Sequence, residues 1–264
     1  MEKLNDAQRA TLEYWNAWIY EQDEDETVMS EYLVSQLGKK PLRILEAACG
    51  GGKLCVPLAK AGHHVTGIDQ SESMLHHLRQ KAATLPNLHV VQADMLTKSW
   101  GNGFDVVILG ANLLVNIITE RDSKRAQKNL LERAYDALKM GGRVFIDYDC
   151  PWEISRWQPA TDEWICFEGT DDRNTYGRYI VVPGTANNRT RIITGSRRWE
   201  IIPAAGNPFT HTETKVQYFP PLEQICTWLY RIGFTVESVN GGYGGEPFDR
   251  EHRRAVIWAR KTVL

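Results

Sequence analysis

Residues 45–52 of the chain read LEAACGGG, and this short stretch decides the fold. An apolar run that ends in three consecutive glycines is typical of a strand that turns sharply into a helix. Glycine has no Cβ, so the backbone there can turn tightly and approach a ligand closely. Three adjacent glycines are equally compatible with a flexible turn, and the surrounding sequence has to decide between these interpretations.

Strand and helix patterns alternate around this stretch, from about residue 42 to residue 148. Apolar runs predict five strands, at residues 43–46, 64–69, 88–94, 104–110 and 143–148. Segments 54–61 and 126–138 predict helices, and Ser71 is a suitable N-cap for another helix. Because strands that alternate with helices are joined by right-handed crossovers, we expect an α/β core with a buried parallel sheet and helices on both faces.

The segments before and after this core differ from it in pattern. Apolar residues at three- and four-residue spacings predict a helical segment over residues 6–37, in which the acidic run 21–26 forms a turn or a helix start. Residues 151–218 contain strand-like pieces and turn signals, which predict an inserted antiparallel sheet. Its expected strands are residues 163–167, 177–182, 190–194 and 197–202.

The last part of the chain returns to the core pattern. Pro220 and Pro221 begin an expected helix, and residues 234–239 and 255–259 are predicted as two final strands joined by a glycine-rich loop. The expected domain organisation is an N-terminal helical segment (1–40), a core (41–150), a β-rich insertion (151–218) and a segment that completes the core (219–264).

Composition and charge narrow the class of protein. The 264 residues carry a net charge of -2, so no basic surplus is available for a polyphosphate backbone, and no nucleic-acid partner is expected. The N-terminus does not resemble a signal peptide and the apolar runs are strand-sized, which predicts no membrane partner and a cytoplasmic location. Five cysteines without metal-type spacing indicate reduced thiols. The pairs His63-His64 and His76-His77 are expected to be solvated or capping residues, so no metal site is predicted.

Acidic residues end three successive expected strands, at Glu46, Asp69 and Asp94. One acid at a strand tip is often only a helix cap, but three in register gather at one edge of the sheet, where open α/β sheets bind ligands. Asp69 is placed to accept hydrogen bonds from a ribose diol, and Asp94 lies close to where an adenine ring would lie. These positions predict an adenosine-containing cofactor.

Two classes of cofactor could use this edge. A dinucleotide site prefers the pattern GxGxxG or GxGxxA; Gly50 and Gly52 fit it, but Cys55 occupies the third position. Glu46 would also place negative charge near an anionic pyrophosphate. An adenosyl sulfonium with an amino-acid tail carries positive charge and no phosphate, so the carboxylates favour the sulfonium.

The motifs together resemble those of the class I S-adenosylmethionine-dependent methyltransferases. Residues 46–52 (EAACGGG) resemble the E/D-x-x-C-G-x-G motif of that family, and residues 103–107 (GFDVV) resemble its fourth-strand motif. Residues 138–142 (LKMGG) resemble its L-x-P-G-G turn, with Met140 in place of proline. The resemblance covers residues 42–148 and the closing strand pair. It implies a Rossmann-like seven-stranded sheet and S-adenosylmethionine as methyl donor, with S-adenosylhomocysteine as product.

The resemblance also implies roles for individual residues. Asp69 is expected at the ribose hydroxyls, Asp94 at the adenine amine, and the glycines at the methionine tail, whereas Met95 could instead pack in the core. The residues expected to surround the cofactor are Glu46, Ala48, Gly50, Gly52, Asp69, Gln70, Asp94, Met95, Gly110 and Asn112.

The layout is similar to that of small-molecule N-methyltransferases of the glycine and sugar-amine type, which carry an N-terminal helical lid and a β-rich insertion on the substrate side. This similarity implies a small-molecule acceptor, with an amine nitrogen as the first expectation. The candidate catalytic residues are Asp147 and Tyr148 at the end of the fifth strand and Tyr20 on the lid. A cap or a loop hydrogen bond is the alternative for the first two, and surface packing for the third.

Other functions stay open from the sequence alone. They are O-methylation of a small molecule, a nicotinamide-dependent oxidation, and a non-catalytic regulator that binds the adenosyl cofactor. The pairs Arg197-Arg198 and Arg253-Arg254 are either partners of a substrate carboxylate or ordinary surface arginines. Neither the acceptor nor the oligomeric state follows from the sequence, which is compatible with a homo-oligomer.

Overall fold

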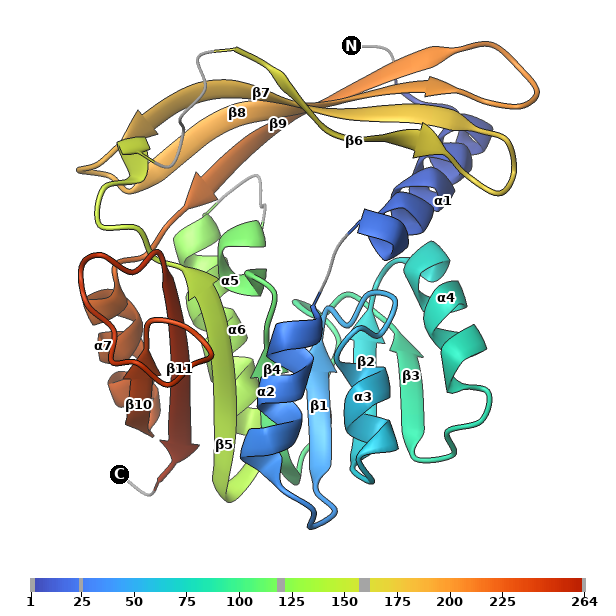
Figure 1. Cartoon of the computed structure of the whole chain (residues 1–264). Coiled ribbons are helices and arrows are strands. Elements are labelled where there is room, and N and C mark those ends of the chain that lie inside the picture. Colours follow the sequence, from blue (N-terminus) through green and yellow to red (C-terminus); the bar gives the residue numbers. More distant parts are fainter. Residues whose placement is uncertain (1–2, 24–25, 118–121, 157–161, 263–264) are drawn as a thin grey trace. The chain divides into compact units, whose positions relative to one another are not determined.

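The computed structural model describes residues 3–23, 26–117, 122–156 and 162–262 (Figure 1). Its elements fall into two compact units. The smaller unit comprises Met1–Asp25 and Glu153–Gln217, and the larger unit comprises Glu26–Trp152 and Tyr218–Leu264. Each unit has its own sheet.

The larger unit contains a seven-stranded sheet in the order β10-β11-β5-β4-β1-β2-β3. Its strands are β1 (Arg43–Ala47), β2 (His64–Asp69), β3 (Leu88–Gln92), β4 (Phe104–Leu109), β5 (Leu138–Asp149), β10 (Phe234–Asn240) and β11 (Arg254–Lys261). The first five strands are parallel, and β11 runs antiparallel to both of its neighbours. The predicted seven-stranded α/β sheet is therefore confirmed, and β5 begins earlier than expected because residues 138–142 already belong to it.

Helices cover both faces of this sheet (Figure 1). One face is covered by α2 (Thr27–Leu37), α3 (Cys55–Lys60) and α4 (Glu72–Ala82); the other is covered by α5 (Leu113–Asn116), α6 (Ser123–Ala137) and α7 (Leu222–Ile232). The Ser71 hydroxyl accepts a hydrogen bond from the Met74 N–H at 3.3 Å, which confirms the predicted N-cap. The described residues include no helix that is long and apolar enough to cross a membrane.

The order of the strands creates a reversal at β1. The chain passes from β1 to β2 and β3 on one side, and then returns to β4 and β5 on the other side of β1. The carboxyl ends of β1 and β4 therefore flank a topological switch point, where open α/β sheets bind ligands. Glu46 of β1 lies there, in register with Gly67 of β2 and Ile108 of β4.

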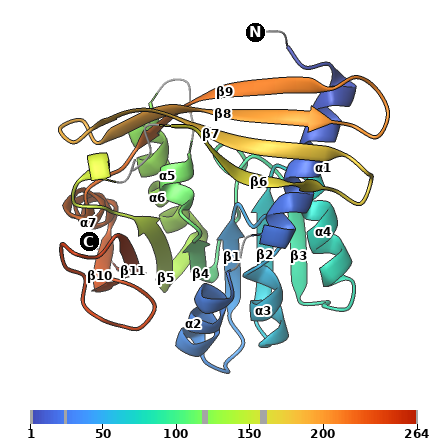
Figure 2. The same ribbon diagram turned by 45° about the horizontal axis from the view of Figure 1, so that its top comes forward.

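In the smaller unit, the long helix α1 lies on a four-stranded sheet in the order β6-β7-β8-β9 (Figure 2). Its elements are α1 (Asp6–Asp23), the short helix η1 (Ile154–Arg156), β6 (Trp164–Thr170), β7 (Tyr176–Asn187), β8 (Ile192–Ile202) and β9 (Phe209–Tyr218). Leu12, Trp15 and Ile19 of α1 form a small core with Trp199 and Ile201 of β8. The Trp15 indole N–H also donates to the Gly169 carbonyl at 3.0 Å.

The insertion is antiparallel as expected, but its strands differ from the predicted ones. Residues 192–194 and 197–202, from two expected strands, belong to a single strand, β8, and β9 was not predicted. The N-terminal segment 1–40 is also divided: α1 belongs to the smaller unit, whereas α2 packs on the seven-stranded sheet. Whether the N-terminal segment acts as a lid stays a prediction.

Candidate active site

The loop after β1 has an unusual backbone. Ala48, Gly50 and Gly52 have φ values of 56°, 50° and 84°, a region that side chains rarely adopt. A Cβ on Gly52 would collide with the Leu78 side chain of α4. The glycine at position 52 therefore allows close packing of the helices, while Ala48 is held in a strained conformation of the kind found at functional sites.

Asp69 ties this loop to the end of β2. One of its carboxylate oxygens accepts the Gly50 N–H at 2.9 Å, and the other accepts the Ser71 N–H at 2.8 Å. A carboxylate has about four acceptor positions, so two remain for other donors. Asp69 thus both shapes the loop and keeps capacity for a diol.

Glu46 is a carboxyl group buried beneath the same loop, with an exposed fraction of 5%. Burial raises the pKa of Glu46 to about 8; a hydrogen bond from the Cys55 thiol lowers it and the nearby Asp69 charge raises it further. Its Oε2 atom is buried and has no hydrogen-bond partner among the described residues. Since a buried carboxylate is costly without a partner, this atom fits a ligand that carries an ammonium group.

Three further predicted cofactor residues lie at the tips of β2 and β3. Asp94 is exposed and caps the turn after β3, where it accepts the Leu96 N–H at 2.8 Å and the Thr97 hydroxyl at 3.1 Å. Met95 is half-buried and Gln70 is exposed. Their position at this edge agrees with the expectation, and their contacts with a cofactor stay predictions.

The loop after β4 is also strained, and it is fixed to β5. Ala111 and Asn112 have φ values of 52° and 61°. The Asn112 side chain donates to Asp149 Oδ2 at 2.6 Å and accepts the Asp149 N–H at 2.5 Å. A Cβ on Gly110 would lie 3.1 Å from the Leu54 side chain. The loops after β1 and β4, which flank the switch point, are therefore the most constrained segments of this edge.

A buried polar network lies where β5 ends. Asp147 accepts the Asn112 N–H at 3.3 Å and the Tyr243 hydroxyl, and its carboxylate lies 3.4 Å from Arg254 Nη1. Arg254 Nε lies 3.7 Å from Asp149 Oδ1. Burial raises the pKa of Asp147, although Arg254 lowers it. Two carboxyl groups thus share one guanidinium, which leaves this end of the site with an excess of acid.

Tyr243 was missed by the sequence analysis, and Arg254 was interpreted differently. Tyr243 lies in the glycine-rich loop 241–245, whose only signal was its composition. Arg254 was expected to be a surface arginine or to pair with a substrate carboxylate, but it pairs with carboxylates of the protein because it lies opposite Asp149 in the β11–β5 register.

Comparison with known proteins identifies the family. Residues 44–142 match the family model described as a methyltransferase domain. The putative methyltransferase YqeM of Bacillus subtilis is 31% identical over 233 residues, which cover 83% of this chain and 84% of that protein. The chain belongs to the S-adenosylmethionine-dependent methyltransferases. Its cofactor is accordingly S-adenosylmethionine, and the nicotinamide alternative is not supported.

Solved structures show the same fold. The sugar N-methyltransferase from a Streptoalloteichus species superposes with a TM-score of 0.68 at 16% identity, covering 100% of this chain and 96% of that one. The amino pentose methyltransferase from Micromonospora echinaspora has a TM-score of 0.60 at 16% identity, covering 99% and 100%. At this level of identity the likeness establishes the fold of the methyltransferase.

Tyr148 and Tyr20 are the other two predicted catalytic residues. Tyr148 of the methyltransferase is completely buried, and its hydroxyl lies 3.3 Å from the Cys150 thiol. A direct contact of this hydroxyl with an acceptor stays a prediction. Tyr20 lies half-buried on α1 in the smaller unit, and its catalytic role also stays a prediction.

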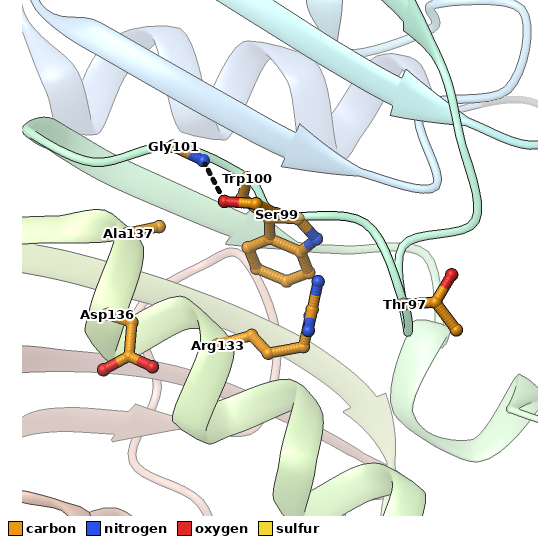
Figure 3. A pocket seen from close by; sticks show the side chains of 7 residues that line it. All are labelled: Thr97, Ser99, Trp100, Gly101, Arg133, Asp136 and Ala137. Atoms are coloured by element: carbon orange, nitrogen blue, oxygen red, sulfur yellow. Dashed lines mark hydrogen bonds between the residues drawn. The ribbon is translucent and has the colours of Figure 1, made fainter.

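A cavity of about 240 Å³ lies elsewhere in the larger unit of the methyltransferase, beside α6 and the segment that precedes β4 (Figure 3). The Arg133 guanidinium lies over the Trp100 ring there, 5.5 Å from its centre. None of the predicted site residues lines this cavity. Its lining residues are Thr97, Ser99, Trp100, Gly101, Arg133, Asp136 and Ala137.

Proposed function

We propose that this methyltransferase transfers a methyl group to an amine nitrogen of a small molecule. The observation that carries the choice of an amine is the acidic network at the end of β5, where Asp147 and Asp149 share the Arg254 guanidinium. The surplus of carboxylate attracts an ammonium group more strongly than a neutral hydroxyl.

On the donor side, we assign Glu46 to the ammonium group of the methionine tail, because its buried Oε2 atom is unpartnered among the described residues. Asp69 is assigned to the ribose hydroxyls and Asp94 to the adenine amine, because both carboxylates retain free acceptor positions. The other residues proposed to line the donor site are Ala48, Gly50, Gly52, Gln70, Met95, Gly110 and Asn112.

S-adenosylmethionine, when bound, supplies an activated methyl group on a positively charged sulfur. The protein then has to align the acceptor lone pair and exclude water. An ammonium must lose a proton before its nitrogen can attack. Because burial raises the pKa of Asp147, its carboxylate is suited to take that proton. Glu46, Asp69 and Asp94 would hold this donor, whose sulfur would be the leaving group when the acceptor nitrogen takes the methyl carbon.

The names of similar proteins support an amine acceptor. The cypemycin N-terminal methyltransferase of a Streptomyces species is 26% identical over 219 residues, covering 81% of both chains. The name of that protein specifies methylation at an N-terminus. Ubiquinone biosynthesis O-methyltransferases of Coxiella burnetii match only 45% of this chain.

Matched acceptors test the proposal. The full chain is incubated with S-adenosylmethionine and with pairs of compounds that differ only in carrying an amine or a hydroxyl, and S-adenosylhomocysteine is measured. We expect turnover with amine members of the panel, and the variant Asp147→Asn should lower kcat for them. Turnover with hydroxyl members alone would show an O-methyltransferase, and donor binding without turnover on any pair would favour the regulator.

A further inference from the structure

The adjacent residues Arg197 and Arg198 of β8 lie on opposite faces of the four-stranded sheet, because side chains alternate along a strand. Ile201 of the same strand is buried against α1, while Ile202 is 51% exposed. By this alternation, Arg197 shares the face of Trp199 and Ile201, and Arg198 shares the opposite face.

Arg198 is fully provided with acidic partners. Its guanidinium donates to both carboxylate oxygens of Glu163, at 2.7 and 2.9 Å, and to Glu200 at 3.2 Å. These contacts lower the pKa of Glu163. Arg198 therefore belongs to an ordinary surface ion-pair cluster.

The surroundings of Arg197 differ from those of Arg198 in lacking acidic partners among the described residues. Within the part of the chain that the structure describes, Arg197 has no acidic partner, and its Nε atom is buried without a hydrogen-bond partner. Its charged neighbour is a second cation, Lys215 of β9. Burial, together with the Arg197 charge, lowers the pKa of Lys215 to about 7. Two half-buried basic groups thus lie near each other, and neither has a carboxylate partner among the residues that the structure describes.

The other polar groups of this face do not neutralise the pair. The Tyr179 hydroxyl is hydrogen-bonded to Arg197, and Cys166 lies near Lys215. Glu213 lies on the same strand as Lys215 and its charge reaches Tyr179, but its carboxylate contacts His211, at 3.1 Å, and neither Arg197 nor Lys215. The positive charge of Arg197 and Lys215 is consequently left for a ligand.

A row of stacked rings runs beside this pair. Phe167 stacks on Tyr179 with ring centres 5.8 Å apart, Tyr179 on Trp199 at 5.2 Å, and Trp199 on His211 at 5.8 Å. Trp199 is buried in the core that α1 forms with this sheet, and Phe167 and Tyr179 pack against that core. Apolar surface next to the two cations is therefore offered by the half-buried rings of Phe167, Tyr179 and His211.

We propose that Arg197 and Lys215 form an oxyanion-binding site, which takes the carboxylate or phosphate of a small molecule whose flat, apolar part lies along the aromatic row. The guanidinium supplies directed donors to two oxygens, and the lysine supplies a point charge. The site goes beyond the proposed amine methylation, since its existence does not depend on the atom that is methylated.

Fluorine NMR of the full chain tests the site with three probes: fluorobenzoate, fluorophenyl phosphate and the neutral fluorobenzyl alcohol. At least one anion should bind more tightly than the alcohol. Arg197→Gln and Lys215→Gln should each weaken anion binding about tenfold, whereas the matched control Arg198→Gln should change it less than about twofold. Arg197→Lys, which keeps the charge, should recover part of the affinity.

Circular dichroism melting shows whether each variant is folded. If Arg197→Gln is not folded, the anion affinity of the Arg197→Lys variant provides the test instead. Equal affinities for the anions and the alcohol would overturn the proposal. Equal losses in Arg197→Gln and Arg198→Gln would also overturn it, because they would indicate a general charge effect.

Kinetics then distinguish two sources of the oxyanion. If it belongs to the methyl acceptor, Arg197→Gln should raise KM for a carboxylated amine about tenfold relative to the corresponding amide. If it belongs to a separate ligand, the two KM values should change equally while the NMR result stands. The kinetic experiment rests on the proposed amine methylation, but the NMR experiment does not. The proposed function and the proposed oxyanion site can therefore fail separately.

Discussion

Glu46 shows how one buried carboxyl group can determine the affinity for a charged ligand. In the absence of a cation it is protonated near neutral pH, since burial raises its pKa to about 8. The ammonium group of the donor would stabilise the ionised form. Glu46→Gln should therefore weaken S-adenosylhomocysteine binding about tenfold or more in calorimetry. The matched control Glu72→Gln, which removes an exposed partner of Arg79, should leave binding unchanged.

The same group makes the stability of the ligand-free protein depend on pH. The folded-state pKa of Glu46 is about 8, compared with 4.5 for an unperturbed side chain. Between these values the folded protein binds more protons than the unfolded chain, so the free energy of unfolding falls as the pH rises from about 4.5 to about 8. Urea unfolding should show this decline in the wild type and a flatter profile in Glu46→Gln. Parallel profiles would exclude Glu46 as the source.

Asn112 connects the loop after β4, proposed to bind the methyl donor, with the polar network at the end of β5, proposed to bind the methyl acceptor. Its side-chain amide donates to Asp149 at 2.6 Å, so Asn112→Asp would set two carboxylates against each other. We expect a loss of about 2 kcal/mol in the free energy of unfolding at neutral pH, with recovery in acid as one carboxylate takes up a proton. Asn102→Asp, at an exposed position before β4, is the control and should change stability little. A loss that does not depend on pH would contradict this account.

At the scale of elements, the docking of α1 on its sheet depends on one glycine of β7. A Cβ on Gly177 would collide with the Trp15 indole, whereas a Cβ on Gly169 would lie 3.2 Å from the flexible end of Ile19. Gly177→Ala should therefore lower the free energy of unfolding by about 1–3 kcal/mol, and Gly169→Ala by clearly less. Thermal melting of the two variants gives the comparison. Equal losses would show that α1 adjusts to either side chain.

The elements of the core could be predicted because apolar runs and turn residues alternate there in a simple rhythm. The insertion was harder. Gly195 and Ser196 resemble a turn, but Gly195 pairs with Pro183 inside the long strand β8, where a Cβ would lie 2.8 Å from a carbonyl oxygen of the neighbouring strand. The β9 segment was missed because residues 210–215 (THTETK) carry no apolar alternation.

At the scale of the whole molecule, the edge of the sheet proposed to bind the methyl donor was predictable from the sequence. The polar network at the end of β5, proposed to bind the methyl acceptor, was not. The acids that end β1, β2 and β3 lie within about fifty residues of one another, and the strand rhythm brings them to one edge. In contrast, Tyr243 and Asp147 are 96 residues apart, and only the antiparallel placement of β11 beside β5 brings their loop and strand together.

The division into two units allows a test by excision. All residues assigned to the donor belong to the larger unit, and the Cys150 thiol lies 3.8 Å from the Pro220 carbonyl, so the cut ends of this unit are close. Residues 26–152 joined to 218–264 by a short glycine linker should bind S-adenosylhomocysteine within about tenfold of the full chain. Methyl transfer should be lost together with the inserted sheet. An unfolded product, detected by circular dichroism, would show that the larger unit needs the smaller one.

The place of β11 has a consequence for synthesis on the ribosome. This strand lies between β5 and β10, although it is translated after both of them and after the whole insertion. Until it emerges, the nascent chain exposes an unpaired β5 edge, and Asp147 has no Arg254 beside it. Open strand edges attract other chains. Polypeptides released before about residue 254 should thus be prone to aggregation and to capture by chaperones or proteases.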